Sequence, residues 1–168
     1  MTQSGLVSAL MSIALLSAAV PAHALEVRDP ETRLGFVVPD GWAVATDGPW
    51  TAVDAPDHRF RGRIMAHTRG AVTDREAESL MLGLLGQKWT TYTVDQHAHR
   101  VVWASFAGVD IVGHGSGDGW DRARFHMFLV VDQSAPARGA IVWLSGRDDA
   151  WDTYHPAIDH AVRLLRST

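Results

Sequence analysis

The sequence predicts an α+β fold, in which a meander of antiparallel β-strands is covered by one mid-chain helix and one C-terminal helix. The strand prediction rests on residues 92–144, where apolar side chains recur at every second position between Gly-rich turns. The helix prediction rests on residues 73–89 and 156–166, where apolar side chains recur at spacings of three and four. No repeat or change in composition divides the chain, so we expect a single domain.

The first 24 residues have the pattern of an export signal. Residues 5–22 carry no charge, and Ala22 and Ala24 form the A-x-A pattern of a signal-peptidase site. This predicts a signal peptide at 1–24, a mature domain at 25–168, and no stable membrane anchor after cleavage. The alternative is a retained anchor, although the apolar segment barely spans a bilayer core of about 30 Å. Residues 1–4 also lack the Lys or Arg usual at the start of a signal peptide.

Composition narrows the classes of function. The chain has no cysteine, which excludes disulfides, a cysteine nucleophile and thiolate metal ligands. Export without cysteine fits the bacterial periplasm or exterior, where a core of ordinary size holds a domain without cross-links. Fifteen basic and nineteen acidic residues give a net charge of −4, with no basic stripe to neutralise phosphates. The sequence therefore argues against a nucleic-acid partner.

The N-terminal part of the mature chain predicts three strands. Residues 36–38 form the first, and the Pro-Asp-Gly sequence at 39–41 predicts a turn, because Pro fixes φ and Gly accepts positive φ. Residues 44–45 begin the second strand, which leads into a loop rich in Gly, Pro and Asp. Along residues 61–68 the side chains alternate between two faces, which predicts the third strand.

The mid-chain helix has the clearest signal. Thr73 and Glu76 form a capping box at its start. The helix is expected to end near Trp89 and to bury one apolar stripe in the core, formed by Ala77, Leu80, Met81, Leu84 and Leu85.

The second half predicts four strands, at 92–106, 109–114, 122–131 and 140–144. The glycine-rich stretch 113–119 lacks the Lys-Ser/Thr of a phosphate-binding loop, so a flexible hairpin loop is the expectation.

The last helix is predicted to hold Pro156 in its first turn, where a missing N–H has no partner to lose. This places Trp151 and Tyr154 in a preceding turn. Asp148, Asp149 and Asp152 stand at the approach to this helix, as capping and dipole-complementing residues or, alternatively, as a cation site.

Two segments give the sequence a family resemblance. Residues 35–42, Gly-Phe-Val-Val-Pro-Asp-Gly-Trp, resemble the strand and turn that open the PsbP/Mog-like α/β/α sandwich domains, and residues 161–167 look like the family's last helix. The resemblance spans nearly the whole mature chain. It implies a binding or assembly module, since members serve as photosystem accessory subunits, a partner of a small GTPase and effector chaperones. No residue matches a catalytic motif of the family, so none is assigned a catalytic role.

Histidines offer a candidate metal site. His97 and His99 stand two residues apart, which on a regular strand puts both on one face together with Asp95. With His114 or His126 from neighbouring strands they would form a histidine-rich site for zinc or copper. The alternative is a polar, solvent-facing edge of the sheet.

Two tryptophans offer a candidate binding surface. Trp50 and Trp120 stand beside Gly-rich turns, where they would line an exposed groove for a small ligand or a protein; the alternative is packing in the core. Ser116 has His114 rather than Gly two residues before it, and Ser145 lacks the flanking glycines of a nucleophile elbow. We therefore expect an exported, non-enzymatic binding or assembly module. The alternatives are a histidine-based metal-binding protein and, third, a small hydrolase.

Overall fold

The computed structural model describes residues 25–167, which contain ten strands and two helices. The predicted signal peptide, residues 1–24, lies outside this range. The strands are β1 (Leu25–Arg28), β2 (Leu34–Val38), β3 (Ala43–Asp47), β4 (Trp50–Asp54), β5 (Phe60–His67), β6 (Trp89–Trp103), β7 (Phe106–Gly117), β8 (Trp120–Asp132), β9 (Gly139–Arg147) and β10 (Arg166–Ser167). The helices are α1 (Asp74–Leu85) and α2 (Asp148–Arg163). Within the described range, neither helix is long and apolar enough to cross a membrane.

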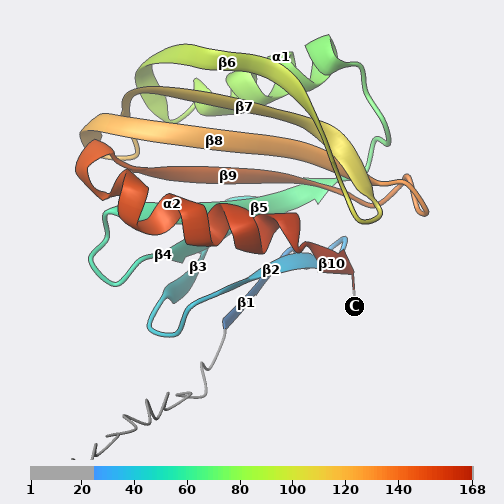
Figure 1. The fold of residues 1–168 in the computed structure, drawn as a ribbon, viewed down its shortest axis with the longest axis horizontal. Helices are drawn as coiled ribbons and strands as arrows, with labels where there is room; N and C mark the ends of the chain where they lie inside the picture. The colour runs from blue at the N-terminus through green and yellow to red at the C-terminus, as the bar shows by residue number, and fades with distance from the viewer. Residues whose placement is uncertain (1–24, 168) are drawn as a thin grey trace, which may run out of the picture.

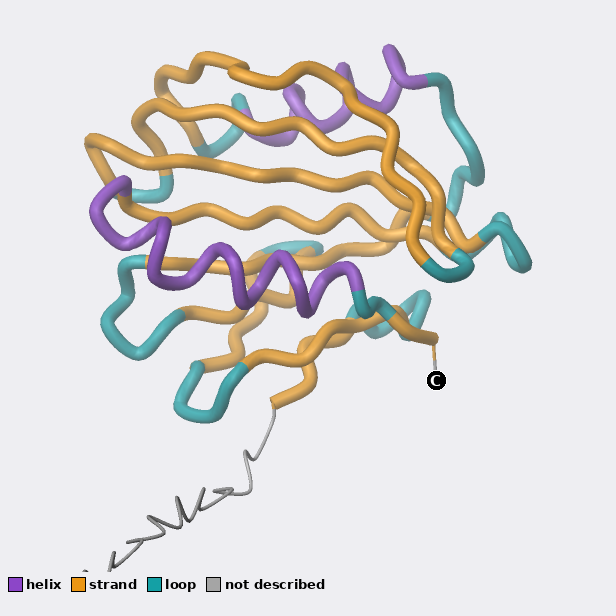
Figure 2. The backbone as a smooth tube through the Cα atoms, viewed as in Figure 1, coloured by secondary structure: helices purple, strands orange, loops and turns teal. Residues whose placement is uncertain are grey.

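A seven-stranded antiparallel sheet forms the centre of the molecule, in the order β3-β4-β5-β9-β8-β7-β6 (Figure 1). A second, three-stranded sheet has the order β1-β2-β10. Figure 2 shows that short turns join β6 to β7 and β7 to β8, as expected of a meander. The predicted fold class, an α+β fold with an antiparallel sheet and two helices, is confirmed.

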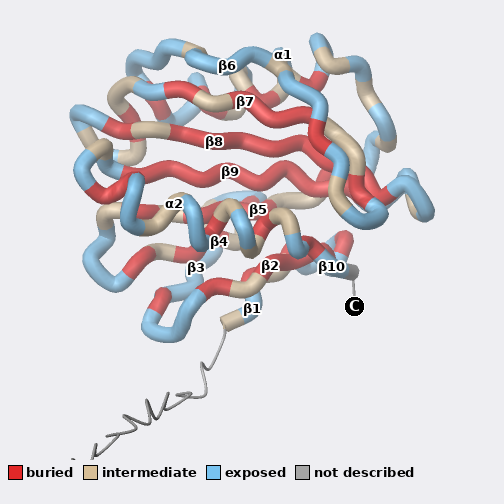
Figure 3. The backbone as a smooth tube through the Cα atoms, viewed as in Figure 1, coloured by how far each residue is buried: buried red, intermediate tan, exposed pale blue. Residues whose placement is uncertain are grey.

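The two helices cover opposite faces of the central sheet. Along β8, Phe125, Met127 and Leu129 belong to the core beneath α1, whereas Phe128 and Val130 belong to the core beneath α2 and the small sheet. Because side chains alternate along a strand, one apolar segment serves two cores. Figure 3 shows the consequence, since β8 and β9 are buried along most of their length.

The mid-chain helix follows its sequence signal. Thr73 is the N-cap, and its capping box with Glu76 is formed in both directions. Ala77, Met81 and Leu85 are the buried residues of its stripe. The helix ends at Leu85 rather than near Trp89, where β6 already begins.

Three strands were not predicted from the sequence: β1, β4 and β10. The first and last are short edge strands that pair with β2 on either side. Strand β4 lies in a segment whose Gly, Pro and Asp residues favour a loop, yet it pairs with both β3 and β5. Tertiary pairing overrides local propensity here.

The C-terminal helix begins earlier than predicted. It starts at Asp148, directly after β9, so that Trp151 and Tyr154 lie in the helix and Pro156 lies well inside it. Pro156 has no N–H to donate to the preceding turn. Trp151, Ile158 and Val162 are nevertheless buried as one stripe, and this burial outweighs the lost hydrogen bond.

The glycine-rich segment is also placed differently from the expectation. Gly113–Gly117 belongs to β7 and is not a flexible loop. A Cβ on Gly115 would lie 2.1 Å from the carbonyl oxygen of Thr91 on β6, so the close approach of the two strands requires glycine. The turn itself is Asp118-Gly119, with φ angles of +55° and +85°, as in two-residue hairpins of type I′.

A buried ion pair anchors this hairpin on the α1 face. Arg63 on β5 donates to both carboxylate oxygens of Asp118, at 2.6 and 3.1 Å, and the two side chains are only 1% and 3% exposed. Ser145 and Trp89 also donate to Asp118, at 2.8 and 3.3 Å. Asp47 accepts from the remaining side of the guanidinium at 3.2 Å. We call these five residues the arginine network.

Candidate functional site

A second polar network lies on the opposite face, between the sheet and α2. It is centred on Asp110 of β7 and His126 of β8, whose side chains are 5% and 6% exposed. His126 Nε2 lies 2.9 Å from Asp110 Oδ2. With His155 and Asp159 of α2, these residues form what we call the histidine network.

Asp110 is held on its other oxygen as well. Gln96 Nε2 and His99 Nδ1 lie 3.1 and 3.2 Å from Asp110 Oδ1. Burial acts to raise the pKa of Asp110, but the hydrogen bonds and charges of His126 and His99 outweigh it and bring the pKa below its usual range. An ionised carboxylate only accepts hydrogen bonds, so His126 donates through Nε2.

The other nitrogen of His126 faces the helix. His126 Nδ1 lies 2.9 Å from His155 Nε2 and 3.6 Å from Asp159 Oδ1. His155 and Asp159 stand four residues apart on α2 and thus share a face of the helix. The ligand atoms of these three residues all lie within 4.8 Å of one another.

Neighbouring rings hold both imidazoles in place. His155 stacks on Trp151 with ring centroids 4.4 Å apart, and His126 lies against Phe128 at 3.9 Å. Burial, followed by the proximity of His126, lowers the pKa of His155 to about 4. His155 is therefore neutral at pH 7.

Asp159 is oriented by an ion pair with Arg163, one helical turn further along α2. Arg163 Nε lies 2.8 Å from Asp159 Oδ2, and Nη2 lies 3.2 Å from Oδ1. The guanidinium in turn lies 5.6 Å from the ring of Trp103 and 5.8 Å from that of Phe128.

The structure separates His97 from His99, which were expected to share a face. His97 Nδ1 lies 2.6 Å from Glu78 Oε1 on α1, whereas His99 contacts Asp110 on the α2 side. The pairing of β6 with β7 shifts register between Val94 and His99, and such irregularities break the alternation of side chains.

The other predicted ligands are also dispersed. His114 pairs with Asp95 at 2.8 Å near the surface, away from the histidine network. Of the four histidines proposed from the sequence, only His126 and His99 are brought together, and they meet through Asp110 rather than directly.

Sequence reasoning missed His155 and Asp159. Their spacing of four would have marked one helix face, but taking Pro156 as part of the first turn placed His155 outside the regular helix.

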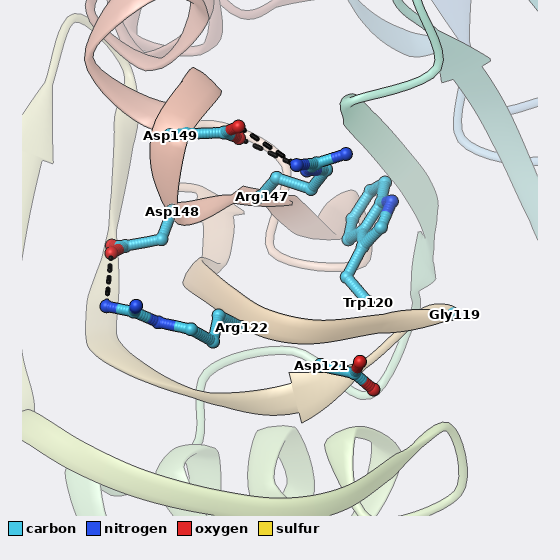
Figure 4. Close-up of a pocket in the computed structure, with 7 residues that line it drawn as sticks. All are labelled: Gly119, Trp120, Asp121, Arg122, Arg147, Asp148 and Asp149. Atoms are coloured by element: carbon cyan, nitrogen blue, oxygen red, sulfur yellow. Dashed lines mark hydrogen bonds and ion pairs between the residues drawn. The ribbon is translucent and has the colours of Figure 1, made fainter.

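An open groove lies where β8 and α2 begin, and we call it the end groove. It consists of two adjoining hollows of about 460 and 480 Å³, which share Asp121, Arg122 and Asp148. Figure 4 shows the residues that line the first hollow, in which the side chains of Trp120 and Arg147 project toward the same edge. The residues lining the two hollows include Thr91, His114, Trp120, Arg124, Arg147, Asp149 and Trp151.

Paired charges of opposite sign characterise the end groove. Asp148 accepts from Arg124 Nε at 2.6 Å and from Arg122 Nη2 at 3.3 Å. Arg147 and Asp149 form a two-bonded pair at 2.9 and 3.1 Å (Figure 4). Arg122 remains 84% exposed, so these charges face solvent.

The two tryptophans proposed for binding are in different environments. Trp120 is partly buried and lines the end groove. Trp50 is only 4% exposed and packs edge to face on Trp143, with centroids 5.8 Å apart. This position corrects the expectation for Trp50, because its strand β4 turns it into the core beneath α1.

Comparison with solved structures places the fold. The chain is similar to the cyanobacterial PsbP protein CyanoP of Synechocystis sp. PCC 6803, with 11% identity, a TM-score of 0.64, and coverage of 90% of this chain and 96% of that one. LpqN of Mycobacterium tuberculosis gives 15% identity, a TM-score of 0.52, and coverage of 88% and 86%. The Ran-binding protein Mog1p of Saccharomyces cerevisiae gives 13% identity, a TM-score of 0.50, and coverage of 85% of this chain and 90% of that one.

These matches confirm the predicted PsbP/Mog-like fold. No family model and no curated protein matches the sequence.

Proposed function

We propose that this protein is an exported, non-enzymatic binding or assembly module that recognises another protein through the end groove. The observation that carries the proposal is the pairing of exposed charges of both signs beside Trp120 in two adjoining hollows. An aromatic side chain with surrounding arginines is typical of protein-binding surfaces.

The charges favour a protein over a small ligand. Small-molecule sites are mostly enclosed and apolar, with few polar groups. In the end groove, Arg122, Arg147 and Asp149 lie toward solvent, in the manner of the polar rim of an interface. A partner with complementary charges of both signs would exchange the internal pairs for intermolecular ones, which fixes the register of the complex.

The structural neighbours support a binding role without specifying the partner. Mog1p is described as a Ran-binding protein, and LpqN is described as involved in cell envelope biogenesis. An envelope location would agree with the signal pattern of residues 1–24, and we infer a periplasmic or secreted protein.

Charge reversal in the groove tests the proposal. A partner captured from a periplasmic extract is first identified by mass spectrometry, then purified and its Kd measured directly. The double variant Arg122→Glu with Arg147→Glu is expected to weaken binding by about tenfold or more, as for like charges brought together in an interface. The matched control is Arg100→Glu, which changes an exposed arginine that pairs with Asp74 at the α1 side.

Two results would overturn the proposal. One is an unchanged Kd in the groove variant, with circular dichroism showing that it is folded. The other is robust turnover by the wild-type protein in a broad hydrolase screen.

A further inference from the structure

We propose that His126, His155 and Asp159 form a zinc-binding site on the α2 face, with Asp110 as its positioning residue. None of these three ligands lines the end groove, although Trp151, which stacks on His155, lines one of its hollows. The proposal does not depend on the function proposed for the groove.

The donor set suits this metal. Two imidazole nitrogens and one carboxylate oxygen are a common ligand set for Zn²⁺. With bonds of about 2.0–2.1 Å, tetrahedral geometry puts neighbouring donor atoms about 3.3 Å apart. The distances from His126 Nδ1 to His155 Nε2 and Asp159 Oδ1 are 2.9 and 3.6 Å, which lie on either side of that value. All three donor atoms lie within 4.8 Å of one another, so zinc would draw them together around one centre.

Asp110 gives His126 the tautomer that a metal ligand needs. Its Oδ2 accepts the Nε2–H of His126 at 2.9 Å, so in the neutral ring the lone pair is on Nδ1, the atom that faces α2. A carboxylate behind a ligating histidine fixes the ring and raises its basicity. Asp110 is itself held by Gln96 and His99, which leaves it little freedom to turn away.

The ligands are also held before any ion binds. Trp151 stacks on His155, Phe128 lies against His126, and Arg163 holds Asp159 by two hydrogen bonds. Ordering them for the metal therefore requires little further loss of side-chain freedom. Two carboxylates against the one guanidinium of Arg163 leave a negative balance that favours a dication.

The site has an inner wall and an open side. His126 is buried in the sheet face, whereas His155 and Asp159 on the outer helix are partly exposed. An ion can enter from the helix side, where water supplies the fourth ligand of a three-residue site.

The test measures Zn²⁺ binding by the exported protein, purified without an affinity tag and treated with chelator. Competition with a chromophoric indicator at neutral pH should show one equivalent bound. We expect His155→Ala to weaken the affinity about 100-fold or more and Asp159→Asn about tenfold or more, since each removes one of three ligands. His97→Ala is the matched control, because His97 also pairs with one carboxylate but on the opposite face.

A second measurement remains decisive even if a variant folds poorly. Imidazole nitrogen NMR of the wild-type protein should show Zn²⁺ shifting His126 Nδ1 and His155 Nε2, with His97 and His114 unaffected. Less than a tenth of an equivalent bound would overturn the proposal. So would binding that survives His155→Ala, or that is lost with His97→Ala.

Discussion

The two faces of the central sheet each bury a polar network, and the two networks differ in what they are able to bind. In the arginine network, Arg63 lies 4.8 Å above the ring of Trp143 and donates to Asp118, Asp47 and Ser145. A guanidinium has five N–H donors and no lone pair; four of the donors of Arg63 are used within the network, and it has no lone pair to offer a cation. In the histidine network, the Nδ1 of His126 faces the Nε2 of His155 at 2.9 Å. Two facing imidazole nitrogens share one proton, which a metal ion is able to replace.

Equal burial therefore does not mean equal function. Each network connects elements far apart in the sequence, as Arg63 does with Asp118 and His126 does with His155. We call the arginine network closed because four of the five N–H donors of Arg63 are taken up by members of the network, and we assign it the structural role of fixing the β7–β8 hairpin. The histidine network contains imidazole nitrogens that can offer a lone pair to a metal ion, and it is partly open through α2, so it is the candidate for ligand binding.

The largest loss of stability is expected when Asp118 is removed from the arginine network. Asp118→Ala leaves the buried guanidinium of Arg63 without its main partner and should lower the free energy of unfolding by about 3–5 kcal/mol. Urea unfolding measures it. Asp121→Ala, at an exposed position just after the same turn, is the control and should change stability by less than about 0.5 kcal/mol. Equal effects of the two variants would contradict the structural role of Asp118.

The next effect concerns the open network. Asp110→Asn keeps the shape of the side chain but removes the carboxylate behind His126, so the affinity for Zn²⁺ should fall about 10–100-fold. Indicator competition measures it, with Asp95→Asn as the control, because Asp95 pairs with the exposed His114. An unchanged affinity would show that Asp110 does not position His126 for a metal.

The arginine network should make the free energy of unfolding depend on pH in the acid range. Burial acts to raise the pKa of Asp118, but the hydrogen bonds and charge of Arg63 outweigh it and bring the pKa below its usual range. The folded state thus holds this proton less tightly than the unfolded state. The stabilising contribution of the ionised Asp118 is complete above about pH 4, and it is lost as the pH falls through the pKa that Asp118 has in the folded state. In Asp118→Asn, the decline of unfolding free energy below pH 4 should be shallower than in wild type; an identical decline in urea titrations would refute this.

The smallest effect is expected at the surface. Arg147→Ala breaks an ion pair with Asp149 in which both side chains are about half exposed, and should change the unfolding free energy by less than about 0.5 kcal/mol. Thermal or urea unfolding measures it. A loss above about 1 kcal/mol would mean that Arg147 supports the start of α2, rather than serving the binding surface of the end groove.

Local patterns in the sequence determined the fold class, the capping box at Thr73 and the strand that contains His126. They did so because hydrophobic periodicity and end-capping act between residues only a few positions apart. The segments at 35–42 and 161–167 together likewise indicated the PsbP/Mog-like fold.

Only the tertiary structure decided which polar side chains meet. The register shifts in β6 sent His97 and His99 to opposite faces, and the early start of α2 carried His155 and Asp159 over His126. Bulges and helix starts of this kind are selected by the burial of distant partners, as when Trp151 packs into the core on the α2 face. Because that burial energy depends on contacts between segments far apart in the chain, it cannot be predicted from a local sequence pattern.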